Sequence, residues 1–360
     1  MITLLDCIER IPAIHQDILN QRPQRFKDLG DYVKNKDIHA IVFIGSGTSN
    51  TSAITACRFV ENVSGLSTYT LLPNEFLRKK DYPKDALYCF VSQTGTSTLT
   101  NQALALAKDK GLWSVCFTGD EDNKLAKASE VHVNIGCGYE EFGQRTIGYH
   151  ATVFSIMLAG LQIGLVNGNL SKAAFDDYLN QAAALPASHK ALSAKAVDWF
   201  DANKDKLMSF DSFALYGADA LWGVALEGAL KILELARRHL CVGYEMDDGM
   251  HGPTLGFTSK IGVIILDDGE HDQKLSKGLA AFTKNEHQSG FVVGANTVDD
   301  TDFAFAAASG AFKALEYAPL VQVLAYRLAV DANVPVIAIK DHKEADKEEK
   351  YFNTHDEELA

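Results

Sequence analysis

The chain has 360 residues, of which 47% are hydrophobic and 22% charged, so its composition is that of a folded protein with a substantial core and excludes general disorder. Its 47 acidic and 34 basic residues give a net charge of -13, which repels phosphate groups and argues against binding to nucleic acid or to a membrane surface. No run reaches the roughly 18 to 20 uninterrupted apolar residues of a membrane span, and acidic residues interrupt the first twenty positions, so we expect a cytoplasmic protein.

Runs rich in β-branched and aromatic residues alternate with longer stretches that permit helices, and this alternation occurs twice. The first series predicts strands at 41–44, 88–91, 113–117 and 131–135, with helices at 50–63 and 100–110. The second series predicts strands at 212–216, 262–266, 291–293 and 303–307. Counted from residues 41 and 213, 88 and 262, 113 and 291, and 131 and 303, corresponding strands lie 172 to 178 residues apart. The repeat predicts two homologous α/β domains, each a mostly parallel sheet flanked by helices on both faces.

Each strand series closes with a long apolar helix, which we expect at 149–166 and at 317–330. A charged, helix-forming stretch separates the two halves, with the boundary near residue 200. The expected organisation is an N-terminal helical segment (1–36), a first domain (37–170), a helical connector (171–205), a second domain (206–340) and a charged, solvated C-terminal tail (341–360).

Two loops between a predicted strand and a predicted helix combine glycine with clustered hydroxyl groups. They are Gly45-Ser46-Gly47-Thr48-Ser49-Asn50 and Ser92-Gln93-Thr94-Gly95-Thr96-Ser97. Glycine lets the backbone approach a ligand, a helix N-terminus presents unpaired amides, and hydroxyls donate to phosphate oxygens. Each loop alone could be a tight turn with a helix cap. Together they favour a phosphate site outside the carboxyl ends of the strands.

Dinucleotide and nucleotide motifs are not completed at these loops. Gly45-Ser46-Gly47 begins like GxGxxG, but the sixth position is Asn50, and the strand expected near 68–72 ends without a ribose-binding acid. Neither glycine run continues into Gly-Lys-Ser or Gly-Lys-Thr, which excludes a Walker loop. The six cysteines are scattered without a CxxC pair, so they suggest small core residues rather than zinc ligands or disulfides.

The two hydroxyl-rich loops, together with several later segments, resemble the sugar isomerase (SIS) domain. The later segments are Cys137-Gly138 through Thr146, Ala225 through Lys231 with Glu234, His251-Gly252-Pro253, and Pro319 through Tyr326. The duplication is similar to that of double-SIS proteins, above all the isomerase half of glucosamine-6-phosphate synthase and related phosphosugar isomerases, deaminases and deglycases. The resemblance implies two tandem SIS domains of flavodoxin-like, three-layer architecture, and it covers nearly the whole chain. It does not include a glutaminase domain, so glutamine-dependent amide transfer is not expected.

The resemblance also implies roles for particular residues. In the phosphate and sugar site it places Gly47, Thr48, Ser49, Ser92, Gln93, Thr94, Ser97, Glu140, Arg145, Thr146 and Glu227. It implies that Glu234 moves the proton between C1 and C2 of the sugar, that His251 opens the ring, and that Lys340 contacts the open sugar or forms a Schiff base with it. It implies no metal and no cofactor, and it implies a homodimer whose subunits share their active sites.

Simpler interpretations of the same residues stay open. Glu227 and Lys231, four residues apart on a helix expected at 221–239, could form a surface ion pair. On that helix Leu226, Leu230 and Leu233 form a separate apolar stripe. Arg145 could face solvent, and 337–340 could be an ordinary strand end.

The expected function is aldose-ketose isomerisation of a hexose 6-phosphate coupled to release of ammonia or an amine, as in an amino-sugar-phosphate deaminase or a fructosamine-phosphate deglycase. A plain phosphosugar isomerase uses the same steps without nitrogen release. A sugar-phosphate-binding regulator is the alternative from a different class, and the presence of both Glu234 and His251 favours an enzyme.

Overall fold

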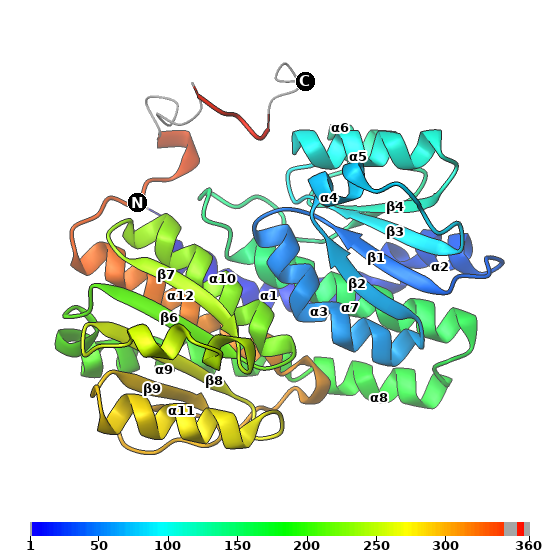
Figure 1. The fold of residues 1–360 in the computed structure, drawn as a ribbon. Helices are drawn as coiled ribbons and strands as arrows, with labels where there is room; N and C mark the ends of the chain where they lie inside the picture. Colours follow the sequence, from blue (N-terminus) through cyan, green and yellow to red (C-terminus); the bar gives the residue numbers. More distant parts are fainter. Residues whose placement is uncertain (1, 342–350, 356–360) are drawn as a thin grey trace. The chain divides into compact units, whose positions relative to one another are not determined.

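A computed structural model describes residues 2–341 and 351–355 of the chain (Figure 1). The chain divides into two compact units, which we call the N-unit and the C-unit. The N-unit contains the described residues of 13–180 and 337–355, and the C-unit contains residues 2–12 and 181–336. The C-terminal tail expected at 341–360 lies mostly outside the described residues.

The N-unit is built on a five-stranded parallel sheet of order β2-β1-β3-β4-β5. Its strands are β1 (Ala40–Ile44), β2 (Ser67–Leu71), β3 (Ala86–Val91), β4 (Trp113–Thr118) and β5 (His132–Asn134). Its helices include α2 (Lys27–Val33), α3 (Thr48–Ser64), α4 (Pro73–Arg78), α5 (Thr98–Asp109), α6 (Lys124–Ala128) and α7 (Ile147–Asn167). Helix α1 (Leu4–Arg25) and helix α8 (Lys172–Ala182) each cross a boundary between the units.

The C-unit repeats this plan with a parallel sheet of order β10-β9-β8-β6-β7. Its strands are β6 (Ser212–Gly217), β7 (Leu240–Glu245), β8 (Ile261–Asp267), β9 (Gly290–Gly294) and β10 (Phe303–Ala304). Its helices are α9 (Leu185–Leu207), α10 (Ala220–Ala236), α11 (Gln273–Asn285) and α12 (Ala314–Asp331), with 3-10 turns η1 (Asp248–Met250), η2 (Pro253–Gly256) and η3 (Gly310–Phe312). Because β6 to β10 occupy the places of β1 to β5, the predicted duplication is confirmed.

Apolar side chains fill both faces of each sheet, because strands buried on two sides need helices over both. In the N-unit, Phe76 of α4 packs edge-on against Tyr88 and Phe90 of β3. Helix α7 is almost wholly buried. Among the described residues, α7 is the one helix that is long and apolar enough to cross a bilayer. However, 83% of its apolar 18-residue window is buried within the protein. Its apolar character is therefore that of a core helix.

Three local predictions were wrong. The helix expected at 221–239 ends at Ala236, because Arg237 takes a left-handed conformation (φ 54°) and the edge strand β7 follows. The strand expected at 303–307 is paired only at Phe303–Ala304, since the carboxylate of Glu316 binds the amides of Ala308 and Ser309 in the loop beyond. Residues 337–340 form no strand: the amide of Ile339 bonds the carbonyl of Glu141, and η4 (Ile339–Asp341) follows.

Candidate functional site

The two hydroxyl-rich loops of the N-unit lie side by side. Strands β1 and β3 are hydrogen-bonded neighbours, with Ile44 opposite Phe90, and each loop leaves the carboxyl end of its strand. The chain turns from β1 toward β2 on one side and from β3 toward β4 on the other, so the loops meet at the switch point of the sheet. A Cβ added at Gly45 would lie 3.0 Å from the carbonyl oxygen of Val91, which shows how closely the strand ends approach. The predicted juxtaposition of the loops is confirmed.

The first loop ends at a helix N-terminus that carries no acidic residue. Gly47 caps α3 with a positive φ of 55°, and Thr48, Ser49 and Asn50 form the first turn of the helix. The side chains of Thr48 and Ser49 are half-buried, whereas Gly47 is exposed. Amides and hydroxyls at the start of a 17-residue helix make a neutral set of donors with the positive end of the helix dipole behind it.

The second loop is held in shape by internal hydrogen bonds. The Ser92 and Ser97 hydroxyls lie 3.1 Å apart, and the Thr96 hydroxyl donates to the Thr94 hydroxyl at 2.9 Å. Gly95 takes φ 67° and a Cβ there would lie 1.8 Å from Oδ1 of Asn123, so this position has room for glycine alone. The loop residues 92–97 carry no formal charge, so a bound phosphate would be held by amides, hydroxyls and the helix α5 dipole.

Glu140 serves as the cap of the buried helix α7. One carboxylate oxygen accepts from the amides of Thr146 (2.5 Å) and Ile147 (2.9 Å), and the other accepts from the amide of Gly148 (3.0 Å). The Thr146 hydroxyl also donates to Glu140, at 3.0 Å. Glu140 is 2% exposed, and its oxygens are engaged in neutralising the first turn of α7.

Gln93 links this cap to the second loop. Its Nε2 donates to Glu140 at 3.3 Å, and its side chain packs over Gly148, where a Cβ would lie 1.8 Å from the Gln93 Oε1. Arg145 is half-buried and donates to the carbonyls of Glu140 and Phe142, both at 3.1 Å, so it does not simply face solvent. Glu140, Arg145 and Thr146 therefore shape the loop around Gln93.

The C-unit contains a buried chain of three charged residues on α10. Lys231 Nζ lies 2.5 Å from the Glu234 carboxylate and 3.5 Å from that of Glu227. Glu227 and Lys231 are 0% and 1% exposed, whereas 35% of the Glu234 side chain is exposed. The alternative of a surface ion pair between Glu227 and Lys231 is therefore wrong, because this face of α10 packs inward.

In this cluster of three charged residues, Glu234 is partly exposed, and the lysine that contacts it, Lys231, is buried. A lysine in the interior is stable only beside compensating carboxylates, and Lys231 has two. Its ammonium holds the Glu234 carboxylate, while 35% of the Glu234 side chain stays exposed. Lys231 belongs to the segment Ala225 through Lys231 that resembles the SIS domain, but the resemblance implied no role for it. The available signal for its place between two carboxylates was its spacing, four residues after Glu227 and three before Glu234.

His251 lies between the two 3-10 turns that follow β7, on the constrained loop that the sequence predicted. Its ring is 74% exposed, and Nε2 is 3.5 Å from Asp247 Oδ1. Its own amide bonds the carbonyl of Asp248, and the next residue, Gly252, has φ 120°. The ring thus has access to a ligand, with a carboxylate beside it. Lys340 is placed only as part of the turn η4, and its side chain lies outside the described residues.

The loop after β8, which corresponds to the second hydroxyl-rich loop, is acidic. The Asp268 carboxylate accepts from the amides of Glu270 and His271, both at 2.9 Å, and from His271 Nδ1 at 2.7 Å. Lys313 Nζ lies 3.1 Å from Asp268 and 2.9 Å from Glu270, so an ammonium already occupies the place between these carboxylates. Burial opposes ionisation of Asp268, but these hydrogen bonds lower its pKa to about 2. In the C-unit loop, the Asp268 carboxylate therefore occupies backbone amides of the loop itself.

No family model matches the chain. Among curated proteins it is 26% identical over 259 residues to glutamine–fructose-6-phosphate aminotransferase [isomerizing] of Bartonella quintana, an alignment that covers 69% of this chain and 42% of that protein. The protein of the same name from Arabidopsis thaliana is 25% identical over 322 residues, which cover 84% of this chain and 46% of the relative. The chain thus spans less than half the length of these relatives.

Solved structures share the fold across nearly the whole chain. A Clostridium difficile protein assigned to the phosphosugar isomerases superposes with a TM-score of 0.88 at 23% identity, covering 98% of this chain and 99% of that one. The C-terminal domain of glucosamine-fructose-6-phosphate aminotransferase from Francisella tularensis has a TM-score of 0.79 at 18% identity, with 92% and 97% covered. Glucosamine-6-phosphate deaminase from Thermotoga maritima has a TM-score of 0.67 at 20% identity, with 89% and 96% covered.

Three findings point to the same kind of protein: the duplicated five-stranded sheets, the adjacent loops at the switch point, and these similarities. The chain is therefore similar in sequence to glutamine–fructose-6-phosphate aminotransferase [isomerizing], and it shares the fold of that enzyme's C-terminal domain and of solved phosphosugar isomerase structures.

Proposed function

We propose that this protein is an enzyme that moves a proton between C1 and C2 of a hexose 6-phosphate, and that it releases ammonia or an amine from an amino-sugar or amine-adduct substrate. The observation that carries this proposal is the buried Lys231, which holds Glu234 in place while 35% of the Glu234 side chain stays exposed. A protein that only senses a ligand has no need for an oriented base of this kind.

The N-unit loops supply the groups that would bind the phosphate. The amides at the starts of α3 and α5 would hold the phosphate oxygens, together with the side chains of Ser49, Ser92, Gln93, Thr94 and Ser97. Anchoring the dianion fixes the sugar and converts the proton transfer into a reaction within one complex, which can account for much of the rate enhancement.

The reaction would proceed in three steps. His251 would pass a proton between the anomeric hydroxyl, on C1 of an aldose or C2 of a ketose, and the ring oxygen, which opens the sugar. Glu234 would then take the proton from C2 and return it to C1, through an enediol or enamine. In a deaminase, water would attack the resulting C2 imine and ammonia would leave; in a deglycase, the proton would move from C1 to C2 and water would release the amine from C1. Lys340 would contact the open sugar. We further propose that the protein acts as a cytoplasmic homodimer.

The test of this proposal is the isosteric Glu234→Gln variant. Its amide oxygen can still accept from Lys231 but cannot take a proton, so we expect kcat to fall by about 10² to 10⁴ while binding of the phosphosugar persists. Turnover of glucosamine 6-phosphate, galactosamine 6-phosphate and fructoselysine 6-phosphate would be followed by ammonia and free-amine assays, and interconversion of glucose and fructose 6-phosphates by a coupled assay.

Glu286→Gln, at an exposed helix end in the same unit, makes the same chemical change and should leave kcat unaltered. Binding without turnover of any of these sugars by the parent protein would instead indicate a regulator. Turnover with nitrogen retained would assign the protein to the plain isomerases.

A further inference from the structure

We infer that a cavity of the N-unit, lined by residues of α1, α7 and α8, binds a small organic anion with one carboxylate on an apolar body. Such a ligand differs chemically from the phosphosugar proposed above, and its binding is independent of the proposed reaction. Three features point to it: the apolar walls of the cavity, a half-buried arginine in its lining, and a side-chain amide beside these groups.

The cavity has the size and the apolar lining of a small-molecule site. Its volume is about 310 Å³, at the lower end of the range of about 300 to 1,000 Å³ that is usual for such sites. Phe26 and Leu158, each 2% exposed, belong to its lining. Half-buried Leu165, Phe175 and Leu179 complete the apolar part. Because all of these residues belong to the N-unit, the cavity is a feature of that unit alone.

Helix α8 provides an apolar wall that the rest of the unit does not cover. Every residue of this helix except Ala182 keeps part of its surface exposed. Tyr178 packs edge-on against Phe59 of α3, with the ring centroids 5.5 Å apart. Phe175 and Leu179 lie four residues apart, hence on one face of the helix, and line the cavity. Two large apolar side chains of α8 are therefore available to a ligand.

One cation in the lining of the cavity is not neutralised. The ammonium of Lys172 bonds the carboxylate of Asp176, and this exposed pair adds no net charge. The half-buried Arg22 donates through Nη1 to the carbonyl of Leu19 at 2.7 Å, and no carboxylate of the described residues lies within ion-pair distance of it. A guanidinium has five N–H groups in a planar fork, so Arg22 keeps donors for a carboxylate.

Gln162 adds a neutral polar group to the same lining. Its amide lies against Gly30 of α2, where a Cβ would be 2.7 Å from Nε2 of Gln162. Within the part of the chain that the structure describes, this side-chain amide makes no hydrogen bond. A guanidinium and an amide can both donate to one carboxylate, whereas the hydroxyls of a sugar would lose their hydration against the apolar walls. The lining therefore matches an apolar acid.

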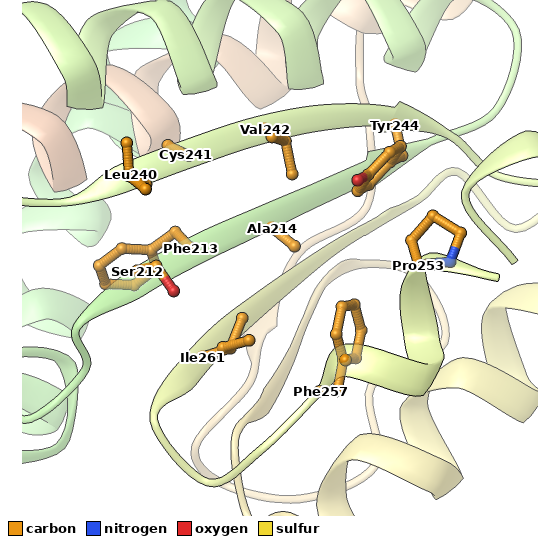
Figure 2. A pocket seen from close by; sticks show the side chains of 11 residues that line it. Ser212, Phe213, Ala214, Leu240, Cys241, Val242, Tyr244, Pro253, Phe257 and Ile261 are labelled. Carbon is orange, nitrogen blue, oxygen red and sulfur yellow. The ribbon is translucent and has the colours of Figure 1, made fainter.

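A hollow of the C-unit has similar walls but no such cation. Figure 2 shows it beside β7, where Leu240, Val242 and Tyr244 lie opposite Phe257, and its volume is about 240 Å³. All of its lining residues are described, and none of them has a charged side chain. This hollow has no group that would hold an anionic head, so the organic anion belongs to the N-unit cavity.

The cavity is separate from the hydroxyl-rich loops. Helix α7 begins beside the second loop, where Gly148 lies under the side chain of Gln93, and it reaches the cavity at Leu158 and Gln162. From Gly148 to Gln162 the helix advances 14 residues, which at about 1.5 Å per residue is ~21 Å. A phosphate at the loops and an organic anion in the cavity can therefore be bound at the same time.

The experiment is titration calorimetry of the full chain with sodium octanoate, and with 1-octanol as the uncharged ligand of the same length. Octanoate should bind saturably, one per chain, and an excess of inorganic phosphate should leave its affinity unchanged. Arg22→Met keeps an apolar side chain and removes the charge, so the affinity for octanoate should fall about tenfold or more while that for octanol stays the same. Arg78→Met removes the same charge at the exposed end of α4 and should change neither affinity.

A second variant tests the cavity by filling it. Leu179→Trp enlarges a half-buried side chain of α8, so it should remove the binding of both octanoate and octanol. The inference is overturned by a parent protein that does not bind octanoate saturably, by equal octanoate affinities of the parent and Arg22→Met, or by full binding in Leu179→Trp. An octanoate affinity that falls as the protein concentration rises would show that a second copy fills the cavity, and this result also overturns it.

Discussion

Lys231 is the buried cation on which the charged cluster of α10 depends. Its ammonium is 1% exposed and lies between a fully buried carboxylate, Glu227, and a half-exposed one, Glu234. Replacing such a group leaves a carboxylate charge in the interior without its neutralising cation, and this is costly because the charge cannot regain its hydration.

At this scale we predict that Lys231→Met lowers the free energy of unfolding by about 3 to 5 kcal/mol, measured by urea denaturation. Lys277→Met, at an exposed position on α11, should change it by less than about 0.5 kcal/mol. Adding Glu227→Gln to Lys231→Met should recover part of the loss, because it removes the buried charge. A Lys231→Met protein as stable as its parent would show that the ion-pair chain is not needed for folding.

At the scale of elements, two equivalent strand-to-helix loops have opposite electrostatic character. The loop after β3 has hydroxyls and no charge, whereas the loop after β8 fills its amide groups with the Asp268 carboxylate. The amides that would bind an external anion in one sheet are thus occupied by a side chain in the other.

The lowered pKa of Asp268 predicts a pH-dependent contribution to stability. A carboxyl group whose pKa falls from 3.8 to about 2 on folding stabilises the folded state above pH 3.8, and this contribution disappears as the pH falls toward 2. We expect Asp268→Asn to be less stable than the parent by roughly 1 to 2 kcal/mol at neutral pH, with the difference shrinking below pH 4. Chemical denaturation at several pH values measures this, and a constant difference from pH 7 to pH 3 would contradict it.

At the scale of the whole molecule, the two similar sheets differ at one pair of equivalent loops: the loop after β3 carries no formal charge, whereas the loop after β8 contains Asp268 and Glu270. We therefore predict that each chain binds one phosphosugar. Titration calorimetry of the Glu234→Gln variant with glucosamine 6-phosphate should give one site per chain, and Ser92→Ala together with Ser97→Ala should weaken that binding. A stoichiometry of two would mean that the acidic edge of the C-unit also takes a sugar phosphate.

Local patterns in the sequence were sufficient to predict the sheets and the two hydroxyl-rich loops. Runs of buried strand residues and their near-constant spacing predicted the duplicated parallel architecture, because a strand buried on both faces must be apolar along its length. Glycine followed by hydroxyls predicted the two loops, because backbone approach and helix caps depend on residues adjacent in the chain.

Only tertiary packing decided which face of helix α10 is buried and which is exposed. The sequence of α10 contains an apolar stripe and a charged stripe, and periodicity alone places the apolar one inside; the structure buries Glu227 and Lys231 because each neutralises the other. The same holds for Glu140, whose role as the cap of α7 depends on a loop that folds back over the helix start. The sequence by itself determined the architecture and the two hydroxyl-rich loops, while the three-dimensional fold decided which charges are buried, since burial depends on the helices, strands and loops that pack over each position.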